Sequence, residues 1–279
     1  MTFRVGGAGA NAALAFVETG MPVRLMGCVG SDQLGRWMRE QIVAAGLTDE
    51  LAVLGDAPTG LTVALESAER DRTFLTYLGV NAGWGPELIA PDALLCDNLL
   101  LCDYFVAPAL QGEAARGLLE TARAAGGRTF FDTAWDPGGF TAATSSQVRA
   151  LLRSVDVFLP NEAEARALTG TDADAVNGTR DAARALQADS GGWVVVKLGA
   201  RGCLAVGPGD AELAAAAPVI VAADTTGAGD AFNAGLVHAL SEGADWPQAL
   251  EAATRFASTI IARPPGERHR WRQFDGSRG

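Results

Sequence analysis

Asp224-Thr-Thr-Gly-Ala-Gly-Asp230 is the stretch of sequence that decides the fold. An apolar run, residues 219–222, precedes it, and a helical pattern, residues 231–240, follows it. We therefore expect a buried strand, a glycine-rich turn and a helix, in that order. Glycine has no side chain, so the backbone of such a turn can approach a ligand closely. The free N–H groups of residues 228–230, together with the helix dipole, would point at one anion.

Asp230 has two interpretations at this position. An aspartate at the start of a helix commonly caps it. A carboxylate beside an anion hole can instead accept the proton of a hydroxyl while backbone donors neutralise a phosphoryl group. The further polar residues Asp224, Thr225 and Thr226 are more than a cap requires. The turn alone leaves both interpretations open.

Short apolar runs alternate with amphipathic stretches along the rest of the chain. Alternation of this kind indicates an α/β domain whose mainly parallel sheet is covered on both faces, and we expect a single domain over residues 1–279. Strands are expected at 23–29, 98–106, 128–132, 155–159, 193–198 and 203–206. Helices are expected at 10–18, 111–125, 163–168 and 179–188.

One segment, residues 59–80, breaks the alternation. Two β-rich runs, 59–66 and 72–78, flank the polar residues 67–71, which predicts a hairpin apart from the main series. An ordinary surface hairpin is one interpretation. A lid is the other, because phosphoryl transfer has to be shielded from water.

Asn161 and Glu164 follow the expected strand at 155–159. Their spacing is that of a capping box, in which the two side chains satisfy the first turn of a helix. They also stand at the carboxyl end of a strand, where ligands bind in α/β sheets. A carboxylate there suits Mg²⁺ that is held largely through water.

Lys197 ends an apolar run and is followed by Gly199 and Gly202. A plain hairpin would need such glycines. Lysine is rarely buried without a partner, and the phosphate of a nucleotide would be one.

Gly7 and Asn11 belong to a glycine-rich opening before the helix at 10–18. The turn would let the backbone approach a small polyol, with the Asn11 amide as donor and acceptor. The pattern Gly7-x-Gly9-x-x-Ala12 partly matches a dinucleotide fingerprint, but an acidic residue is missing where Gly27-Cys-Val29 ends the next strand. A nicotinamide oxidoreductase is therefore disfavoured.

Composition narrows the class of protein. The chain has 279 residues, 48% of them hydrophobic, and a net charge of −11, which disfavours nucleic acid as a partner. Four scattered cysteines fit free thiols in a cytoplasmic protein, and two histidines make a histidine metal site or a Ser-His-Asp triad improbable. No signal peptide or membrane span is expected. The basic residues near the end are expected to form a solvated tail: Arg268, Arg270 and Arg272.

In their order along the chain, these segments resemble the ribokinase-like, or PfkB, family of carbohydrate kinases. The resemblance covers nearly the whole chain. The matching motifs are Gly6-Gly-Ala-Gly-Ala-Asn11, Gly27-Cys-Val-Gly-Ser-Asp32 with Gly35, Asn161-x-x-Glu164, and Asp224-Thr-Thr-Gly-Ala-Gly-Asp-Ala-Phe232. The last of these is the most specific.

The resemblance implies a role for each motif. Asp230 would be the base that activates the substrate hydroxyl, and Gly227, Ala228 and Gly229 would form the anion hole. ATP and Mg²⁺ would be bound by Asn161, Glu164, Lys197, Gly199 and Gly202, with Glu164 on the metal. Asp224 and Thr226 match positions that hold a monovalent cation in several members, which makes K⁺ a candidate cofactor. Gly7, Asn11 and Asp103 would contact the sugar.

The resemblance also implies a three-layer α/β/α sandwich with a small β lid, and a homodimer as a candidate assembly. Family members usually carry some thirty residues before the Gly-Gly motif, including a first core strand, whereas here the sequence begins five residues before Gly6. We therefore expect the first strand to be missing, with a neighbouring strand edge left unpaired. With no basic cluster for a second phosphate, an unphosphorylated sugar or nucleoside-like substrate is favoured. The alternative is a non-catalytic small-molecule or nucleotide binder.

Overall fold

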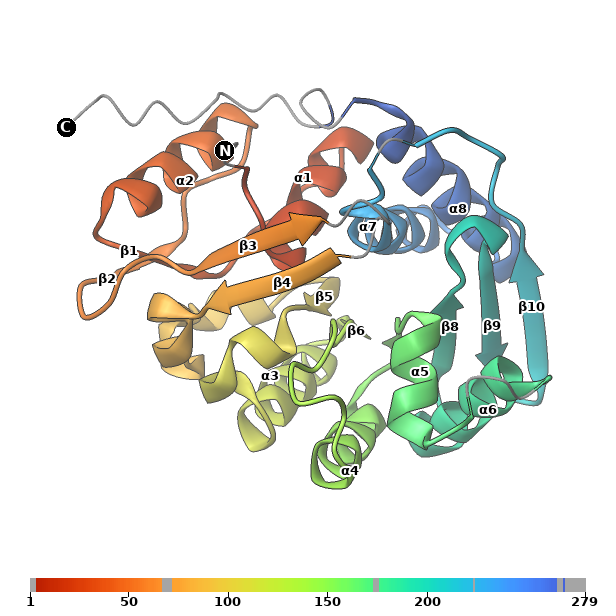
Figure 1. The fold of residues 1–279 in the computed structure, drawn as a ribbon. Helices are drawn as coiled ribbons and strands as arrows, with labels where there is room; N and C mark the ends of the chain where they lie inside the picture. The colour runs from red at the N-terminus through yellow and green to blue at the C-terminus, as the bar shows by residue number, and fades with distance from the viewer. Residues whose placement is uncertain (1–3, 67–71, 173–175, 223, 265–267, 269–279) are drawn as a thin grey trace.

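A six-stranded mixed sheet forms the centre of the computed structural model, which describes residues 4–66, 72–172, 176–222, 224–264 and 268 (Figure 1). The strand order is β10-β9-β8-β7-β6-β5. The four strands β5 to β8 run parallel, and β9 and β10 continue the sheet antiparallel. The strands are β5 (Asn98–Leu101), β6 (Arg128–Phe131), β7 (Val157–Phe158), β8 (Trp193–Lys197), β9 (Cys203–Gly207) and β10 (Ala211–Ala215).

Two groups of helices cover the two faces of this sheet. Side chains alternate along a strand, so Val195 faces one hydrophobic cluster while Val194 and Val196 face the other. Figure 1 shows the two groups on opposite sides of the molecule, which confirms the three-layer arrangement. One group is α1 (Ala8–Thr19), α7 (Ala228–Ser241) and α8 (Trp246–Ala262); the other is α3 (Glu113–Ala124), α4 (Ala142–Leu151), α5 (Glu162–Thr169) and α6 (Gly178–Ser190).

Three strand predictions were wrong in part. Of residues 23–29, only the end is β-structure, as β1 (Cys28–Gly30) paired with β2 (Ala52–Leu54). The strand predicted at 98–106 ends at Leu101, because Asp103 takes a left-handed φ of 56° and turns the chain away. The apolar run at 219–222 is not a strand, and Val219 and Val221 are fully exposed. These runs were predicted as strands from their apolar residues, but a strand also needs a neighbouring strand to pair with.

The predicted hairpin is present as β3 (Leu61–Glu66) and β4 (Arg72–Tyr77), which pair antiparallel in a sheet of their own. Residues 67–71 lie outside the described residues. Asp32 fixes the base of the hairpin, because its carboxylate accepts hydrogen bonds from the amide and hydroxyl of Thr59. The same carboxylate caps α2 (Gln33–Ala44) through the amide of Gly35. The Gly27–Gly35 motif therefore joins the hairpin to the body of the protein.

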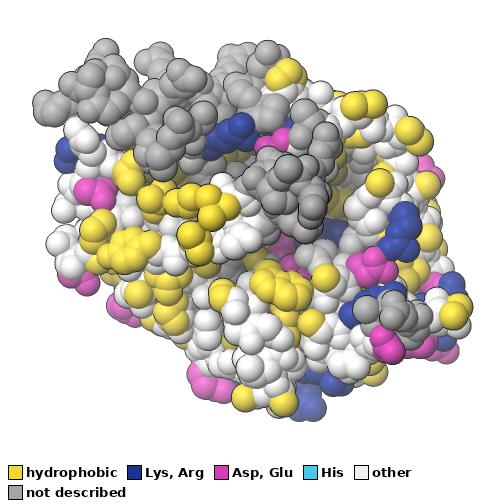
Figure 2. Space-filling model, viewed as in Figure 1, with side chains coloured by type: hydrophobic (Ala, Val, Ile, Leu, Met, Phe, Trp, Pro, Cys, Tyr) yellow, Lys and Arg dark blue, Asp and Glu magenta, His cyan; other side chains and the backbone are white. Residues whose placement is uncertain are grey.

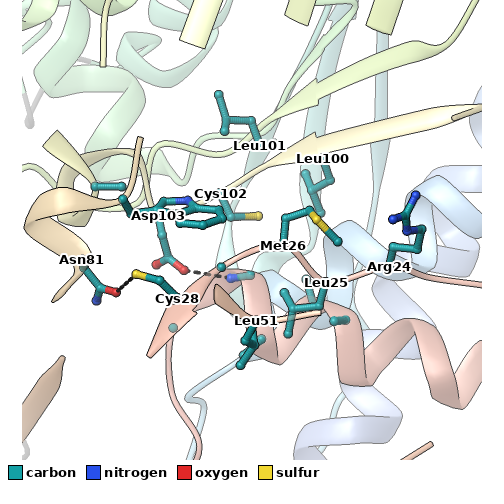
Figure 3. Close-up of a pocket in the computed structure, with 18 of the residues that line it drawn as sticks. Arg24, Leu25, Met26, Cys28, Leu51, Asn81, Leu100, Leu101, Cys102 and Asp103 are labelled. Atoms are coloured by element: carbon teal, nitrogen blue, oxygen red, sulfur yellow. Dashed lines mark hydrogen bonds between the residues drawn. The ribbon is translucent and has the colours of Figure 1, made fainter. Parts of the chain in front are cut away.

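An apolar cavity of about 770 Å³ lies along β5. Figure 3 shows Leu25 and Met26 on one side of it and Leu100 on another. Within the described residues β5 pairs only with β6, so its second edge is unpaired on the side of this cavity. Also within the described residues, no helix has both the length and the hydropathy of a membrane span.

Candidate active site

Asp230 lies in the first turn of α7, which begins at the glycine-rich turn. Gly227 is the N-cap residue, with a left-handed φ of 80° that favours glycine, and no side chain caps the helix. The Asp230 carboxylate instead accepts a hydrogen bond of 2.9 Å from Nδ2 of Asn11. A Cβ at Gly227 would lie 4.0 Å from both of these polar groups. The turn therefore faces the Asn11–Asp230 pair, and the capping interpretation is wrong.

The start of α1 brings the glycine-rich opening to the same place. Oδ2 of Asp103 accepts a hydrogen bond of 2.9 Å from the amide of Gly9, as the dashed line in Figure 3 shows. Gly7 has a φ of 92°, and a Cβ there would lie 3.2 Å from the same carboxylate oxygen. Burial raises the pKa of Asp103, against the opposing effect of the Gly9 and Ala8 amides. Gly7, Asn11, Asp103 and Asp230 thus form one polar cluster between α1, α7 and the end of β5.

Burial is also the main cause that raises the pKa of Asp230, to about 8. The negative charges of Asp132 and Asp103 act in the same direction, whereas the Asn11 hydrogen bond and the Lys197 charge oppose them. A carboxylate with this proton affinity is well matched to accepting a proton near neutral pH.

Lys197 lies beside the glycine-rich turn and is held by a carboxylate. Its Nζ is 2.5 Å from Oδ2 of Asp132, and the same oxygen accepts a hydrogen bond of 2.6 Å from Asn233. Burial would lower the pKa of Lys197, but Asp132 and Glu164 outweigh it and the pKa is raised. A Cβ at Gly229 would lie 3.5 Å from the lysine Nζ. A fixed positive charge therefore stands next to the backbone donors of α7.

Asn161 and Glu164 form the predicted capping box at the start of α5. Oε2 of Glu164 accepts from the Asn161 amide at 2.8 Å, and Oδ1 of Asn161 accepts from the Glu164 amide at 2.9 Å. The amide of Lys197 donates to Pro160 O at 2.9 Å, which holds this segment against the end of β8. Burial, aided by the charge of Asp132 and opposed by Lys197, raises the pKa of Glu164 to about 7.

The donors present fit Mg²⁺ only as an ion held largely by water and phosphate. In the part of the chain that the structure describes, no three His, Cys, Asp or Glu side chains are arranged to hold a metal ion. The Asn161 amide donates to Oε2 of Glu164, which leaves Oε1 of this carboxylate for the ion or its water.

Gly199 and Gly202 lie in the turn between β8 and β9, which form the plain hairpin that the sequence left open. Gly202 has a φ of 94°, and a Cβ there would lie 1.9 Å from Ala215 O, so only glycine fits. Gly199, with a φ of 60°, is exposed. The requirement at Gly202 is therefore structural, whatever ligand the turn meets.

Arg268 corrects the prediction of a solvated tail. It is only 5% exposed, and its guanidinium donates to the backbone carbonyls of Asp224 and Thr226. The Asp224 carboxylate is in turn 3.0 Å from the guanidinium of Arg4. Arg270 and Arg272 lie outside the described residues. Arg4 and Arg268, near opposite ends of the sequence, therefore hold the segment that leads into the glycine-rich turn.

Comparison with known proteins shows the family to which the chain belongs. The model of the pfkB family carbohydrate kinases matches residues 1–267. The chain belongs to the PfkB family of carbohydrate kinases. It is thus a member of a family of ATP-dependent phosphotransferases. This membership argues against the dinucleotide-binding interpretation of Gly7-x-Gly9.

Relatives of this PfkB kinase are named for different activities. A 1-phosphofructokinase of Rhodobacter capsulatus is 31% identical over 275 residues, which cover 94% of this chain and 83% of the relative. A ribokinase of Haemophilus influenzae is 25% identical, with 92% and 81% covered. The structure of an adenosine kinase from Sinorhizobium meliloti matches with a TM-score of 0.80 at 27% identity, covering 93% of this chain and 80% of that one.

Two residues of this candidate site were missed from the sequence, Asp132 and Asn233. Asp132 follows β6 directly, just as Asp103 follows β5 closely, so the rule that ligands bind at the carboxyl ends of strands could have found it. Asn233 lies within α7, and its contact with Asp132 joins residues 101 positions apart. No local pattern signals such a contact.

Proposed function

We propose that this chain transfers the γ-phosphoryl group of ATP to a hydroxyl of a small unphosphorylated sugar or sugar-like molecule. The observation that carries the proposal is Asp230, whose carboxylate has a pKa raised to about 8 and is held by Asn11 beside the glycine-rich start of α7. Proton acceptor and backbone donors then meet at one place, as in-line phosphoryl transfer requires.

Each part of the cluster has a role in this proposal. Asp230 takes the proton of the sugar hydroxyl. The hydroxyl oxygen attacks the γ-phosphorus of ATP, and ADP leaves. The backbone amides of Gly227, Ala228 and Gly229 stabilise the charge on the transferring group. Gly7, Asn11 and Asp103 bind the sugar, since Asp103 and Asn11 offer hydrogen-bonding groups at the first turn of α1.

The nucleotide is proposed to lie along the other side of α7. The Lys197 ammonium, next to Gly229, would pair with its phosphates, and the turn at Gly199 and Gly202 would border it. Asn161 fixes Glu164, which would hold Mg²⁺ through water. When bound, this ion would neutralise phosphate charge.

The charges near the sugar cluster favour a substrate without a phosphate group. Of the residues that the structure describes, the arginines that line the cavity beside the cluster are Arg4 and Arg24. Arg4 pairs with Asp224, and Arg24 pairs with Glu50 and Asp92. Because both are already neutralised, neither is offered to a phosphorylated sugar, even though one relative is named a 1-phosphofructokinase.

The hairpin over residues 59–80 is proposed to be the lid and the dimer contact. Leu65, Leu75 and Tyr77 share one face of it, and each is more than half exposed. Figure 2 shows apolar side chains gathered over β3 and β4. Sedimentation should show a homodimer that Leu75→Asp dissociates.

The free thiols of Cys28, Cys96, Cys102 and Cys203 fit a cytoplasmic location, which we propose.

ADP release, coupled to an optical assay, tests the proposed function on a panel of sugars, nucleosides and sugar monophosphates. Turnover with an unphosphorylated sugar or nucleoside supports it, and turnover with sugar monophosphates alone contradicts the substrate class. Binding of ATP by calorimetry without turnover on any panel member would support the alternative, a non-catalytic binder.

A further inference from the structure

Arg268 places a buried guanidinium against four backbone carbonyls. Nη1 donates to Thr226 O at 2.9 Å, and Nη2 donates to Asp224 O and, at 3.2 Å, to Ile261 O. Nε donates to Arg263 O at 3.2 Å. A planar guanidinium with five N–H donors is suited to such a ring of acceptors. The carbonyls come from two separate segments, the turn before α7 and the end of α8, so Arg268 joins them.

These carbonyls include the ones at the positions where the sequence resemblance suggested a monovalent cation. The oxygens of Asp224 and Thr226 point at the guanidinium, and Arg268 is 5% exposed. A K⁺ ion on the same oxygens would bring two positive charges together in a buried site, which is unfavourable. The residues present therefore do not fit a free monovalent cation.

We propose that Arg268 takes the place of a monovalent cation in this chain. Its charge holds the backbone of 224–226 in the conformation from which the anion hole at Gly227 to Gly229 continues. Arg268 is thus a positioning residue that acts through the turn, and the enzyme needs no K⁺. The activity arm of the test rests on the proposed kinase function, whereas the stability arm does not.

The other charged side chains around this turn are paired elsewhere, so Arg268 is the one that we assign to the ring of carbonyls. The Asp224 carboxylate faces outward to Arg4 at 3.0 Å and also accepts from the Thr226 amide at 2.9 Å. The guanidinium of Arg263 is 3.1 Å from Glu18, and it donates to Arg268 O at 3.5 Å. Arg263 therefore contributes its backbone carbonyl to the ring, while its side chain lies outside it. Arg263→Gln is a matched control, since it removes a neighbouring arginine charge and leaves the ring.

The first test uses the parent protein in buffers of equal ionic strength that contain KCl, NaCl or choline chloride. The melting temperature and the rate of ADP release should be the same in all three. A K⁺-specific rise in melting temperature, or activity about tenfold higher in KCl than in NaCl, would overturn the proposal, because either shows a cation site that Arg268 does not fill.

The second test uses Arg268→Gly, which vacates the ring of carbonyls. In choline chloride its melting temperature should fall and its rate of ADP release should drop by about tenfold or more, because hydrogen bonds from a charged group are lost. KCl or a low concentration of guanidinium chloride should restore both, whereas Arg263→Gln should respond to neither. Arg268→Lys, which keeps the charge, should stay insensitive to K⁺.

Two results with these variants would also overturn the proposal. One is parental stability and activity of Arg268→Gly without K⁺. The other is a folded Arg268→Gly whose melting temperature neither K⁺ nor guanidinium raises. If the chain binds ATP but turns over no substrate, the proposed function fails while the cation dependence of the melting temperature still decides the role of Arg268.

Discussion

The ion pair between Lys197 and Asp132 gives a quantitative prediction about stability. The perturbation is Asp132→Asn, which keeps the shape of the side chain and removes its charge. Nζ and Oδ2 are 2.5 Å apart, and the two side chains are 13% and 6% exposed. The substitution therefore leaves the Lys197 ammonium buried without its closest counter-ion.

Breaking a buried pair of this kind costs about 3–5 kcal/mol of unfolding free energy. Glu164 and Asp230 also act on Lys197 with negative charge and replace part of the lost attraction. We therefore expect a loss near the lower limit, about 3 kcal/mol. The double variant Asp132→Asn/Lys197→Met lacks the buried, unpaired ammonium and should be more stable than Asp132→Asn alone by at least ~1 kcal/mol.

Urea unfolding followed by tryptophan fluorescence measures these differences, since the chain has six tryptophans. Glu212→Gln is the control, because it breaks two exposed pairs, with Arg180 and Arg184, whose side chains are 47% and 60% exposed, and each lost pair should cost less than ~1 kcal/mol. The reasoning is refuted if Asp132→Asn is no more destabilising than this control, or if Lys197→Met makes the Asp132→Asn protein less stable.

Three further predictions concern the site. The pH profile of kcat/KM should rise to a plateau with a pKa near 8, because Asp230 must lose its proton to act as a base, and Asp132→Asn should lower that pKa by removing a negative charge; a flat profile contradicts this. Glu164→Gln should raise the Mg²⁺ concentration needed for half-maximal ADP release by about tenfold with little change in sugar KM, since only the ion's carboxylate is lost. Gly227→Ala should lower kcat by about tenfold or more, because it puts a methyl group on a left-handed residue facing Asp230, whereas Gly6→Ala, with open space around it, should match the parent.

Local pattern predicted most of the layers from the sequence. The helices α3, α5 and α6 lie within two residues of the expected bounds, since amphipathic periodicity marks the buried stripe of each helix. The glycine-rich turn was predicted because glycine is typical of turns, and Gly227 does take the positive φ that glycine adopts without strain. The capping box of Asn161 and Glu164 was equally local, because both partners lie within one helical turn.

Contacts between distant segments could not be predicted in the same way. The expected role of Asn11 in binding the sugar stays a prediction, but its hydrogen bond to Asp230, 219 positions away, could not be predicted from spacing. Arg268 was assigned to a solvated tail because its acceptors are backbone carbonyls. Every residue has such a carbonyl, so the sequence does not mark the partners of Arg268. Asp132 was overlooked since its partner Lys197 becomes a neighbour only when β6, β7 and β8 pair. Such partners are set by the order of the strands and not by spacing along the chain.

The role of Asp230 as base is the central claim, and Asp230→Asn tests it most directly. The measurement is the rate of ADP release with the best sugar of the panel, for the parent and for Asp230→Asn, with ATP affinity measured alongside by calorimetry. We predict a loss of about 10²–10⁴ in kcat with ATP affinity unchanged, because a general base acts in the transition state. Parental turnover by a folded Asp230→Asn protein would contradict the account.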